Sequence, residues 1–229
     1  MTRMVALVPM KGHSERVPNK NLRNFNDRPL CHWILNTLSH TPEVDEIVVN
    51  TDSGRIADEA RTFNATVLTR PERLRGDHVS MNKIILHDIA ETDGDLYLQT
   101  HCTNPLLCSD TISEAVSMFK ETDCDSIFSV TPLQTRLWDE DGVPINHQRD
   151  ELKRTQDLPP VYEENSNIYL FTNKSIKRRE NRIGNNPTMY PMEEREAIDI
   201  DELIDFKIAE KLHQKKYGDK PKLGEVLGE

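Results

Sequence analysis

The sequence is poor in the features that mark several large classes of protein. Its 229 residues include only 4 cysteines, with no C-x-x-C pair and no histidine at zinc-finger spacing, so we predict neither a disulfide framework nor a structural metal site. No apolar run approaches the roughly 20 residues that cross a bilayer, and the apolar start is too short for a signal peptide. We therefore expect a soluble, cytoplasmic protein with no membrane partner.

Several catalytic motifs are also missing. The chain has no G-x-x-x-x-G-K-[ST] loop and no G-x-G-x-x-G fingerprint, which argues against a P-loop ATPase and a nicotinamide-dependent dehydrogenase. It has neither G-x-S-x-G nor H-E-x-x-H, so nothing supports a hydrolase of those types.

Positive charge is scarce overall but concentrated at the amino end. The formal net charge is -10 and the pI is about 5.3, which argues against a nucleic-acid partner because phosphate backbones select basic surfaces. Residues 1–30 nevertheless carry six cations and two anions, a balance of +4 that leaves -14 for the rest of the chain. A basic segment in an acidic protein favours a small anionic ligand.

Short apolar runs alternate with amphipathic segments along most of the chain, which is long enough for one large α/β domain with an appendage. This alternation predicts a mostly parallel sheet covered by helices on both faces, with ligands bound beyond the carboxyl ends of the strands. We expect strands at 5–9, 46–50, 66–68, 96–99, 126–130, 167–171 and 198–201, and helices at 30–39, 56–63, 80–91, 111–121 and 202–217.

The pattern breaks down over residues 131–160. This stretch contains four prolines, many charges and little apolar periodicity, and it exceeds the length of an ordinary loop. We therefore divide the chain into a core, 1–130 and 161–229, and a protruding arm, 131–160.

Two segments have the residue types of a phosphate and metal site. The loop from Lys11 to Asn21 follows the first strand, and its backbone N–H groups with Lys11, Arg16 and Lys20 suit a triphosphate, although a solvated basic loop is the alternative. On a strand, Asp199 and Asp201 would face the same side and suit Mg²⁺, whereas the alternatives are a solvated strand face or a helix N-cap at Asp201.

The basic loop also carries a family resemblance. Residues 9–21 read Pro-Met-Lys-Gly-His-Ser-Glu-Arg-Val-Pro-Asn-Lys-Asn, and four further segments follow in the same order as in the family. They are Leu-Thr-Arg-Pro at 68–71 with Asp77 and Ser80, Leu98-Gln99 with Thr-Asn-Pro-Leu at 103–106, Arg154 ahead of Leu158-Pro159 and Asn165, and Ile-Asp-Ile-Asp at 198–201. These motifs span nearly the whole chain and resemble the acylneuraminate cytidylyltransferases, the CMP-sialic acid synthetase family.

The resemblance implies a Rossmann-like nucleotidyltransferase fold, a three-layer sandwich whose arm serves dimerisation. It implies roles in three groups. Nucleotide binding falls to Lys11, Gly12, Ser14, Arg16, Lys20, Arg70 and Ser80; sugar-acid binding to Gln99, His101, Asn104, Arg154 and Asn165; and Mg²⁺ binding to Asp199 and Asp201, which with Lys11, Arg16 and Lys20 form the catalytic set. The loop departs from the sialic-acid branch at Lys11 and at Glu15-Arg16, and 100–105 is longer than the family's usual segment, so either Gln99 or His101 and Asn104 would contact the sugar.

We therefore expect a Mg²⁺-dependent homodimeric enzyme that transfers CMP from CTP to the anomeric hydroxyl of a sialic-acid-like α-keto sugar acid and releases pyrophosphate. The alternatives are a cytidylyltransferase for another anionic acceptor, such as Kdo or a phosphonate, and a non-catalytic nucleotide-binding dimer. Retention of both aspartates and all three loop cations argues against the non-catalytic alternative.

Overall fold

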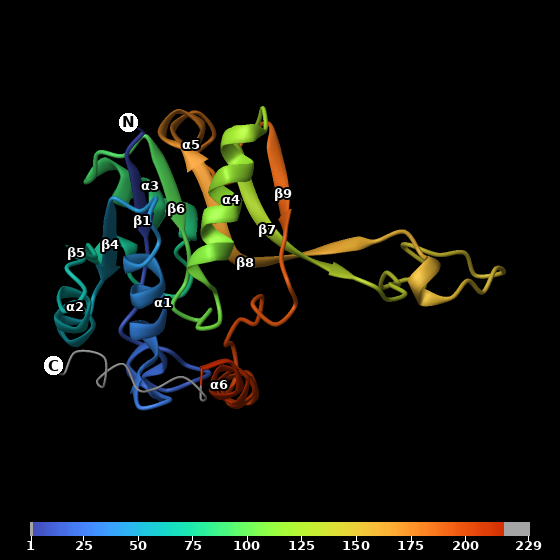
Figure 1. Cartoon of the computed structure of the whole chain (residues 1–229), viewed down its shortest axis with the longest axis horizontal. Helices are drawn as coiled ribbons and strands as arrows, with labels where there is room; N and C mark the ends of the chain where they lie inside the picture. The colour runs from blue at the N-terminus through green and yellow to red at the C-terminus, as the bar shows by residue number, and fades with distance from the viewer. Residues whose placement is uncertain (1, 218–229) are drawn as a thin grey trace, which may run out of the picture.

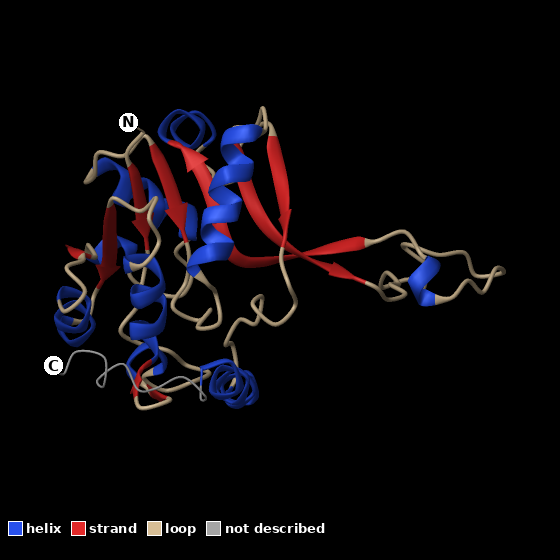
Figure 2. Cartoon of the chain, viewed as in Figure 1, coloured by secondary structure: helices blue, strands red, loops and turns tan. Residues whose placement is uncertain are grey.

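A computed structural model describes residues 2–217, and seven of its strands form one twisted sheet (Figures 1 and 2). The strand order is β5-β4-β1-β6-β8-β7-β9, and only β8 runs antiparallel to its neighbours. The strands are β1 Met4–Leu7, β4 Glu46–Thr51, β5 Thr66–Thr69, β6 Leu96–Gln99, β7 Ser126–Leu133, β8 Val161–Thr172 and β9 Pro187–Pro191. The predicted α/β class with a mostly parallel sheet is confirmed.

Helices cover both faces because side chains alternate along the buried strands. Met4, Ala6 and Val8 face one apolar cluster, with α1, α2 and α4, whereas Val5 and Leu7 face the other, with α3 and α5. The helices are α1 Leu30–Ser39, α2 Gly54–Arg61, α3 Met81–Ala90, α4 Ser109–Glu121, α5 Asn173–Arg179 and α6 Leu203–Tyr217. No helix among the described residues is long and apolar enough to cross a membrane.

The carboxyl-terminal segment packs against a short hairpin near the start of α1. Phe25, in the hairpin of β2 (Asn24–Phe25) and β3 (Arg28–Pro29), and Leu30 pack with Ile200 and with Phe206 of α6 in a third apolar cluster. The rings of Phe25 and Phe206 meet edge to face at 5.3 Å. This cluster holds the carboxyl-terminal segment against the amino-terminal loop. Residues 218–229 of the expected core lie outside the described residues.

The arm is built by two strands that leave the sheet together (Figure 1). β7 and β8 remain paired out to Leu133 and Val161, and the chain between them forms irregular turns and the 3-10 helix Thr155–Asp157. The register shifts between Phe128 and Val130, where β8 turns away from the core. Residues 131–160 thus lie on a projection whose base includes strand residues on both sides.

The structure differs from the sequence expectations in four places. Residues 198–201 form no strand, so the geometric argument that placed Asp199 and Asp201 on one strand face is wrong. β9, α5 and the β2–β3 hairpin were not predicted; β9 begins and ends in proline, which disfavours strand assignment except at a sheet edge, where β9 lies.

Two glycines allow a matched test of core packing. A Cβ on Gly94 would meet the Tyr97 ring and a Val5 methyl at 2.9 Å, whereas Gly54, the first residue of α2, has open space around it. Gly94→Ala should lower the free energy of unfolding by about 1–3 kcal/mol through overpacking. Gly54→Ala should leave the free energy of unfolding unchanged or raise it by up to about 1 kcal/mol, because alanine lowers the conformational entropy of the unfolded chain. Urea denaturation measures both, and equal destabilisation by the two would contradict the packing described.

Candidate functional site

A cleft of about 310 Å³ opens where the carboxyl ends of β1 and β6 meet the carboxyl-terminal segment. It brings together five stretches that are distant in the sequence. Its lining residues are Pro9, Lys11, Lys20 and Asn21; Arg70, Gly76, Asp77, Val79, Met81 and Ile84; His101, Cys102 and Thr103; Ser166; and Asp199 and Asp201.

The basic loop is tied to the carboxyl-terminal segment by direct bonds. Lys20, whose side chain is only 12% exposed, donates from Nζ to the carbonyl oxygen of Ile200 at 2.6 Å and lies 4.0 Å from an Asp201 carboxylate oxygen. Arg16 donates to the same Asp201 oxygen at 2.7 Å. Lys11 pairs with Asp77 across the cleft and holds the pKa of that carboxyl below its usual range. The predicted cations therefore gather at one site, although Arg16 lies at its edge and not on its lining.

Gly12 and Ser14 support the loop from outside the cleft. The Gly12 N–H donates to an Asp52 carboxylate oxygen at 2.7 Å, and a Cβ at Gly12 would lie 2.9 Å from Ser53 Cβ. The loop can therefore lie this close to the end of β4 only with glycine at this position. Ser14 is half-buried beside it.

Arg70 lines the cleft but is held from behind. It is buried, with Nε donating to Asn50 Oδ1 at 2.7 Å and a terminal nitrogen to the Asn50 carbonyl at 3.0 Å. Asn50 in turn donates to buried Asp88, whose pKa burial raises to about 6. Ser80 precedes α3 and is exposed, so its neighbours Val79 and Met81 form that part of the wall.

Asp199 and Asp201 both line the cleft although they are not on a strand. Ile200 lies fully buried between them, and its N–H donates to the Thr103 carbonyl at 2.9 Å, so the pair is fixed by one apolar anchor and one backbone bond. Burial raises the pKa of Asp199 against the opposing effect of a hydrogen bond from the Thr103 side chain, and among the described residues the buried Oδ1 atom has no hydrogen-bond partner. Asp205 accepts from the N–H groups of Asp201 and Glu202 at the start of α6, so the capping carboxylate is that of Asp205 and Asp201 is free of that task.

This pair fits a Mg²⁺ ion that takes its other ligands from water and phosphate. A buried carboxylate oxygen with no hydrogen-bond partner among the described residues, in a cleft also lined by Lys11 and Lys20, is the kind of donor that a hard cation accepts. No group of three or more His, Cys, Asp or Glu residues able to hold a metal occurs within residues 2–217. Two protein carboxylates are sufficient for Mg²⁺ in a phosphate site, where the substrate completes the coordination shell.

Three of the five candidate sugar-binding residues, Gln99, His101 and Asn104, lie at or beside the cleft. His101 lines the cleft, and burial, with the nearby cations Arg182 and Lys20, lowers its pKa to about 3. Gln99 is fully buried behind it and donates to His101 Nε2 at 2.9 Å. Asn104 is also fully buried, and its side-chain amide has no hydrogen-bond partner in the part of the chain that the structure describes.

Arg154 and Asn165 do not reach the cleft of their own chain. Arg154 lies out on the arm in an exposed ion pair with Asp157, with nitrogen–oxygen distances of 2.7 and 3.0 Å. Asn165 is engaged at the arm's base, where it accepts from the Ser129 hydroxyl at 2.5 Å and donates to the Thr131 hydroxyl at 2.9 Å. Its neighbour Ser166, at a left-handed φ of 60°, lines the cleft instead.

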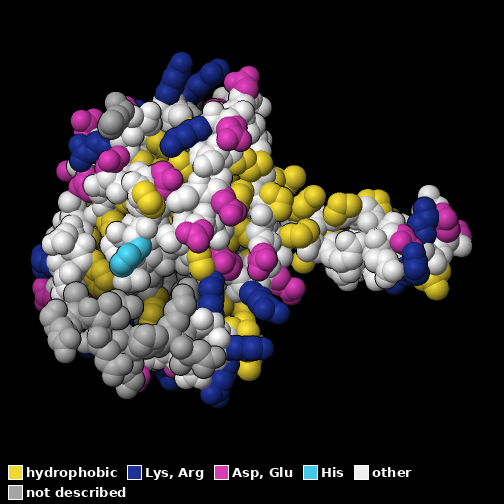
Figure 3. Space-filling model, in the orientation of Figure 1, with side chains coloured by type: hydrophobic (Ala, Val, Ile, Leu, Met, Phe, Trp, Pro, Cys, Tyr) yellow, Lys and Arg dark blue, Asp and Glu magenta, His cyan; other side chains and the backbone are white. Residues whose placement is uncertain are grey.

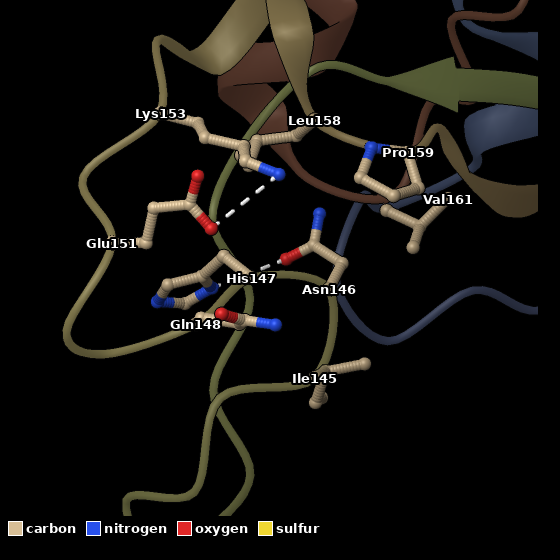
Figure 4. A pocket seen from close by; sticks show the side chains of 9 residues that line it. All are labelled: Ile145, Asn146, His147, Gln148, Glu151, Lys153, Leu158, Pro159 and Val161. Atoms are coloured by element: carbon tan, nitrogen blue, oxygen red, sulfur yellow. Dashed lines mark hydrogen bonds and ion pairs between the residues drawn. The ribbon is translucent and has the colours of Figure 1, made fainter.

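The arm has a larger hollow of its own, of about 420 Å³ (Figure 4). Its lining is mixed, with Ile145, Leu158 and Val161 beside a Lys153–Glu151 ion pair at 3.6 Å. It lacks the clustered cations and unpartnered carboxylate of the sheet-edge cleft. The chemistry therefore belongs to the smaller space.

Sequence reasoning missed one residue beside the site. Arg182, in the loop after α5, donates to Gln99 Oε1 at 2.7 Å, and its guanidinium lies 3.7 Å from the centre of the Tyr169 ring. Its sequence context, a basic and asparagine-rich turn, has no periodicity or motif that separates it from a solvated surface.

Comparisons with known proteins agree on one family. A family described as Cytidylyltransferase matches residues 5–221. The CMP-N,N'-diacetyllegionaminic acid synthase of Legionella pneumophila is 33% identical, covering 92% of this chain and 96% of its own. The pseudaminic acid cytidylyltransferase of Campylobacter jejuni is 22% identical, covering 92% and 96%. The N-acylneuraminate cytidylyltransferase of Escherichia coli is 26% identical over 94% of this chain, which spans only 53% of that protein.

Solved structures show the same fold at low identity. A CMP:2-keto-3-deoxy-manno-octonic acid synthetase complexed with CTP aligns with a TM-score of 0.71 at 12% identity, covering 94% of this chain and all of the other. The 4-diphosphocytidyl-2C-methyl-D-erythritol synthase of Anaerococcus prevotii aligns at 0.68 and 14%, covering 93% and 99%. At such identities the likeness establishes the architecture alone.

Proposed function

The chain belongs to the cytidylyltransferase family, and from that premise we propose that it transfers CMP from CTP to the anomeric hydroxyl of a sialic-acid-like α-keto sugar acid. The observation that carries the proposal is the cleft itself, where Lys11 and Lys20 face Asp199 and Asp201 at the carboxyl edge of the sheet. Its support is similarity, over 92–94% of this chain, to relatives named for sialic, legionaminic and pseudaminic acids. We place the reaction in the cytoplasm, where CTP is available.

The reaction needs orientation and charge stabilisation more than covalent chemistry. The acceptor oxygen bonds to the α-phosphorus of CTP, the bond to the β-phosphate oxygen breaks, and pyrophosphate and one proton leave. Negative charge develops on the phosphate oxygens, so pre-placed cations stabilise the transition state more than the bound substrate. Lys11, Arg16 and Lys20 supply that charge in our proposal, with Gly12, Ser14, Arg70 and Ser80 shaping the nucleotide pocket around them.

Asp201 changes partners in this scheme. Without substrate its carboxylate is neutralised by Arg16 at 2.7 Å and Lys20 at 4.0 Å. A triphosphate draws both cations toward itself, which frees Asp201 to join Asp199 as a ligand. Mg²⁺ held there would supply Lewis-acid polarisation of the α-phosphate.

One assay tests both the sugar-acid acceptor and the choice of nucleotide. With Mg²⁺ and CTP we expect pyrophosphate release with at least one acid from a panel of sialic, legionaminic, pseudaminic and Kdo-type sugars, and no comparable rate with ATP or GTP. Turnover of Kdo alone would move the acceptor to the alternative class. Equal rates with ATP and CTP would refute cytidylyl transfer, and no turnover with any acid would favour a binding protein.

Asp201→Asn separates metal binding from folding. We expect activity to fall by roughly 10² to 10³, as when one oriented charge is lost from a phosphoryl-transfer site. The free energy of unfolding should change by less than about 1 kcal/mol, because the Arg16 pair is exposed and such pairs stabilise little. Asp199→Asn should act similarly, and the double variant should cost less than the sum because both residues serve one ion.

The matched control is Glu202→Gln, which removes the same charge at the next, exposed position. It should retain wild-type turnover and Mg²⁺ dependence. Near wild-type activity and an unchanged Mg²⁺ titration in Asp201→Asn would rule out the metal role.

We propose that the arm pairs two copies of the chain. It exposes Trp138 (48%), Ile145 (59%) and Leu152 (87%), and hydrophobic side chains also gather where it leaves the core (Figure 3). A second copy is the occupant favoured by the family resemblance, with Arg154 then able to reach the partner's sugar-acid site.

Light scattering at micromolar concentration should give twice the chain mass of 26.4 kDa. Leu152→Asp should shift the particle toward the monomer, because it places a charge in an apolar contact. Arg154→Gln should leave the mass unchanged and weaken acceptor binding. A wild-type particle of single-chain mass would disprove the pairing.

A further inference from the structure

Arg182 is a buried cation that lies behind the cleft and not in it. Its side chain is 18% exposed and is sandwiched against Tyr169, donating to the phenol oxygen at 3.0 Å and to Gln99 Oε1 at 2.7 Å. Gln99 and Tyr169 are direct cross-strand neighbours on β6 and β8. The Arg182 N–H donates to Asn82 Oδ1 at 3.3 Å, which joins its loop to α3.

A guanidinium has five N–H donors and no acceptor, so the atom of the Gln99 amide that faces it must be the acceptor, Oε1. This fixes the Gln99 amide with Oε1 toward Arg182 and the NH₂ group away from it. That NH₂ group donates to the Thr100 carbonyl at 3.2 Å and to His101 Nε2 at 2.9 Å. All the polar atoms of Gln99 are thus engaged within the protein, and Gln99 does not line the cleft.

The amide orientation determines the state of His101. A donor on Gln99 requires a lone pair on His101 Nε2, so the ring proton of the neutral imidazole is on Nδ1. Burial and the cations Arg182 and Lys20 keep the ring neutral, with a pKa lowered to about 3. Among residues 2–217, no hydrogen bond to His101 Nδ1 is formed, and the ring lines the cleft beside Lys20.

We infer that Arg182 is a positioning residue that acts through Gln99 to hold His101 as the Nδ1–H tautomer, so that His101 offers a hydrogen-bond donor to an oxygen of the acidic acceptor. The role in acceptor binding rests on the proposed function, whereas the tautomer does not. Gln99, which the family resemblance assigns to the sugar, then acts on it only through His101.

Two substitutions break the Arg182–Gln99–His101 chain of hydrogen bonds, which we call the relay, at different points. Gln99→Glu keeps the shape and the Arg182 contact but replaces the donor that faces His101 with an acceptor, which moves a proton onto Nε2. Arg182→Gln replaces the donor-only guanidinium with an amide that can also accept, so the Gln99 amide can rotate by about 180°. Arg182→Lys keeps a donor-only cation and should largely preserve the tautomer.

The tautomer is measured without any substrate. Long-range ¹⁵N–¹H NMR spectra of the histidine rings distinguish Nδ1–H from Nε2–H, and His101→Gln assigns the signal by its loss. We expect Nδ1–H in the wild type and in Arg182→Lys, and a protonated Nε2 in Gln99→Glu. An Nε2–H ring in the wild type would overturn the inference.

Kinetics then test the effect on the acceptor. Arg182→Gln should raise the acceptor KM roughly tenfold, the effect of one lost hydrogen bond, with the CTP KM within about twofold of wild type. Arg179→Gln is the matched control, because exposed Arg179 lies at the end of α5 just before the same loop, and its side chain donates to Asn185 Oδ1 at 2.7 Å. This variant should behave as wild type.

An unchanged acceptor KM in folded Arg182→Gln, or an equal rise in the control, would also overturn the inference. If the wild type turns over no sugar acid, the proposed function fails, and the spectrum alone decides whether the relay exists.

Discussion

The cleft depends on the contact that Ile200 makes with the hairpin and loops at the carboxyl edge of the sheet. Ile200 is buried among Phe25, Leu30 and Phe206, its N–H bonds to the loop after β6, and its carbonyl accepts from Lys20. A parallel sheet edge alone offers only loops that project in one direction. This contact returns the carboxyl-terminal segment to that edge and places two carboxylates opposite the basic loop. Without it, Arg16 and Lys20 would lose their acidic partner, and Asp77, which pairs with Lys11, would be the carboxylate left on the cleft lining.

Much of the architecture could be predicted from the sequence because buried strands and amphipathic helices leave strong periodicities. The expected strand at 96–99 and helix at 30–39 match β6 and α1 at both ends. The strand predicted at 198–201 was wrong because the alternation of apolar and acidic residues also fits an irregular extended segment in which one apolar residue, Ile200, is buried. What is local in sequence was predictable, whereas the partner of an isolated residue such as Ile200 was not.

The residues of the candidate site were likewise predictable where a local motif marks them and unpredictable where their role depends on distant contacts. Motif positions led to Lys11, Lys20, Asp199 and Asp201, which the fold gathers in one cleft. Arg182, which lies behind the cleft, could not be predicted from the sequence, because its contacts with Gln99 and Tyr169 depend on the pairing of β6 with β8. Arg70 and Arg182 are alike in one respect: each is a largely buried cation that donates to a side-chain amide oxygen from a strand of the sheet, Arg70 on the cleft lining and Arg182 behind it. Buried charges are tolerated only when so paired.

The continuity of β8 has a consequence for how the protein can diverge. This 12-residue strand passes from the arm through Ser166 in the cleft wall into the middle of the sheet. Residues gained or lost among 134–160 leave the pairing within the chain's own sheet intact, since surface loops absorb them at little cost in stability. One residue gained or lost near Ser166 would instead exchange the two faces of the strand and disturb the cleft wall. The sheet therefore tolerates a change of length at the tip of the arm but not at its base.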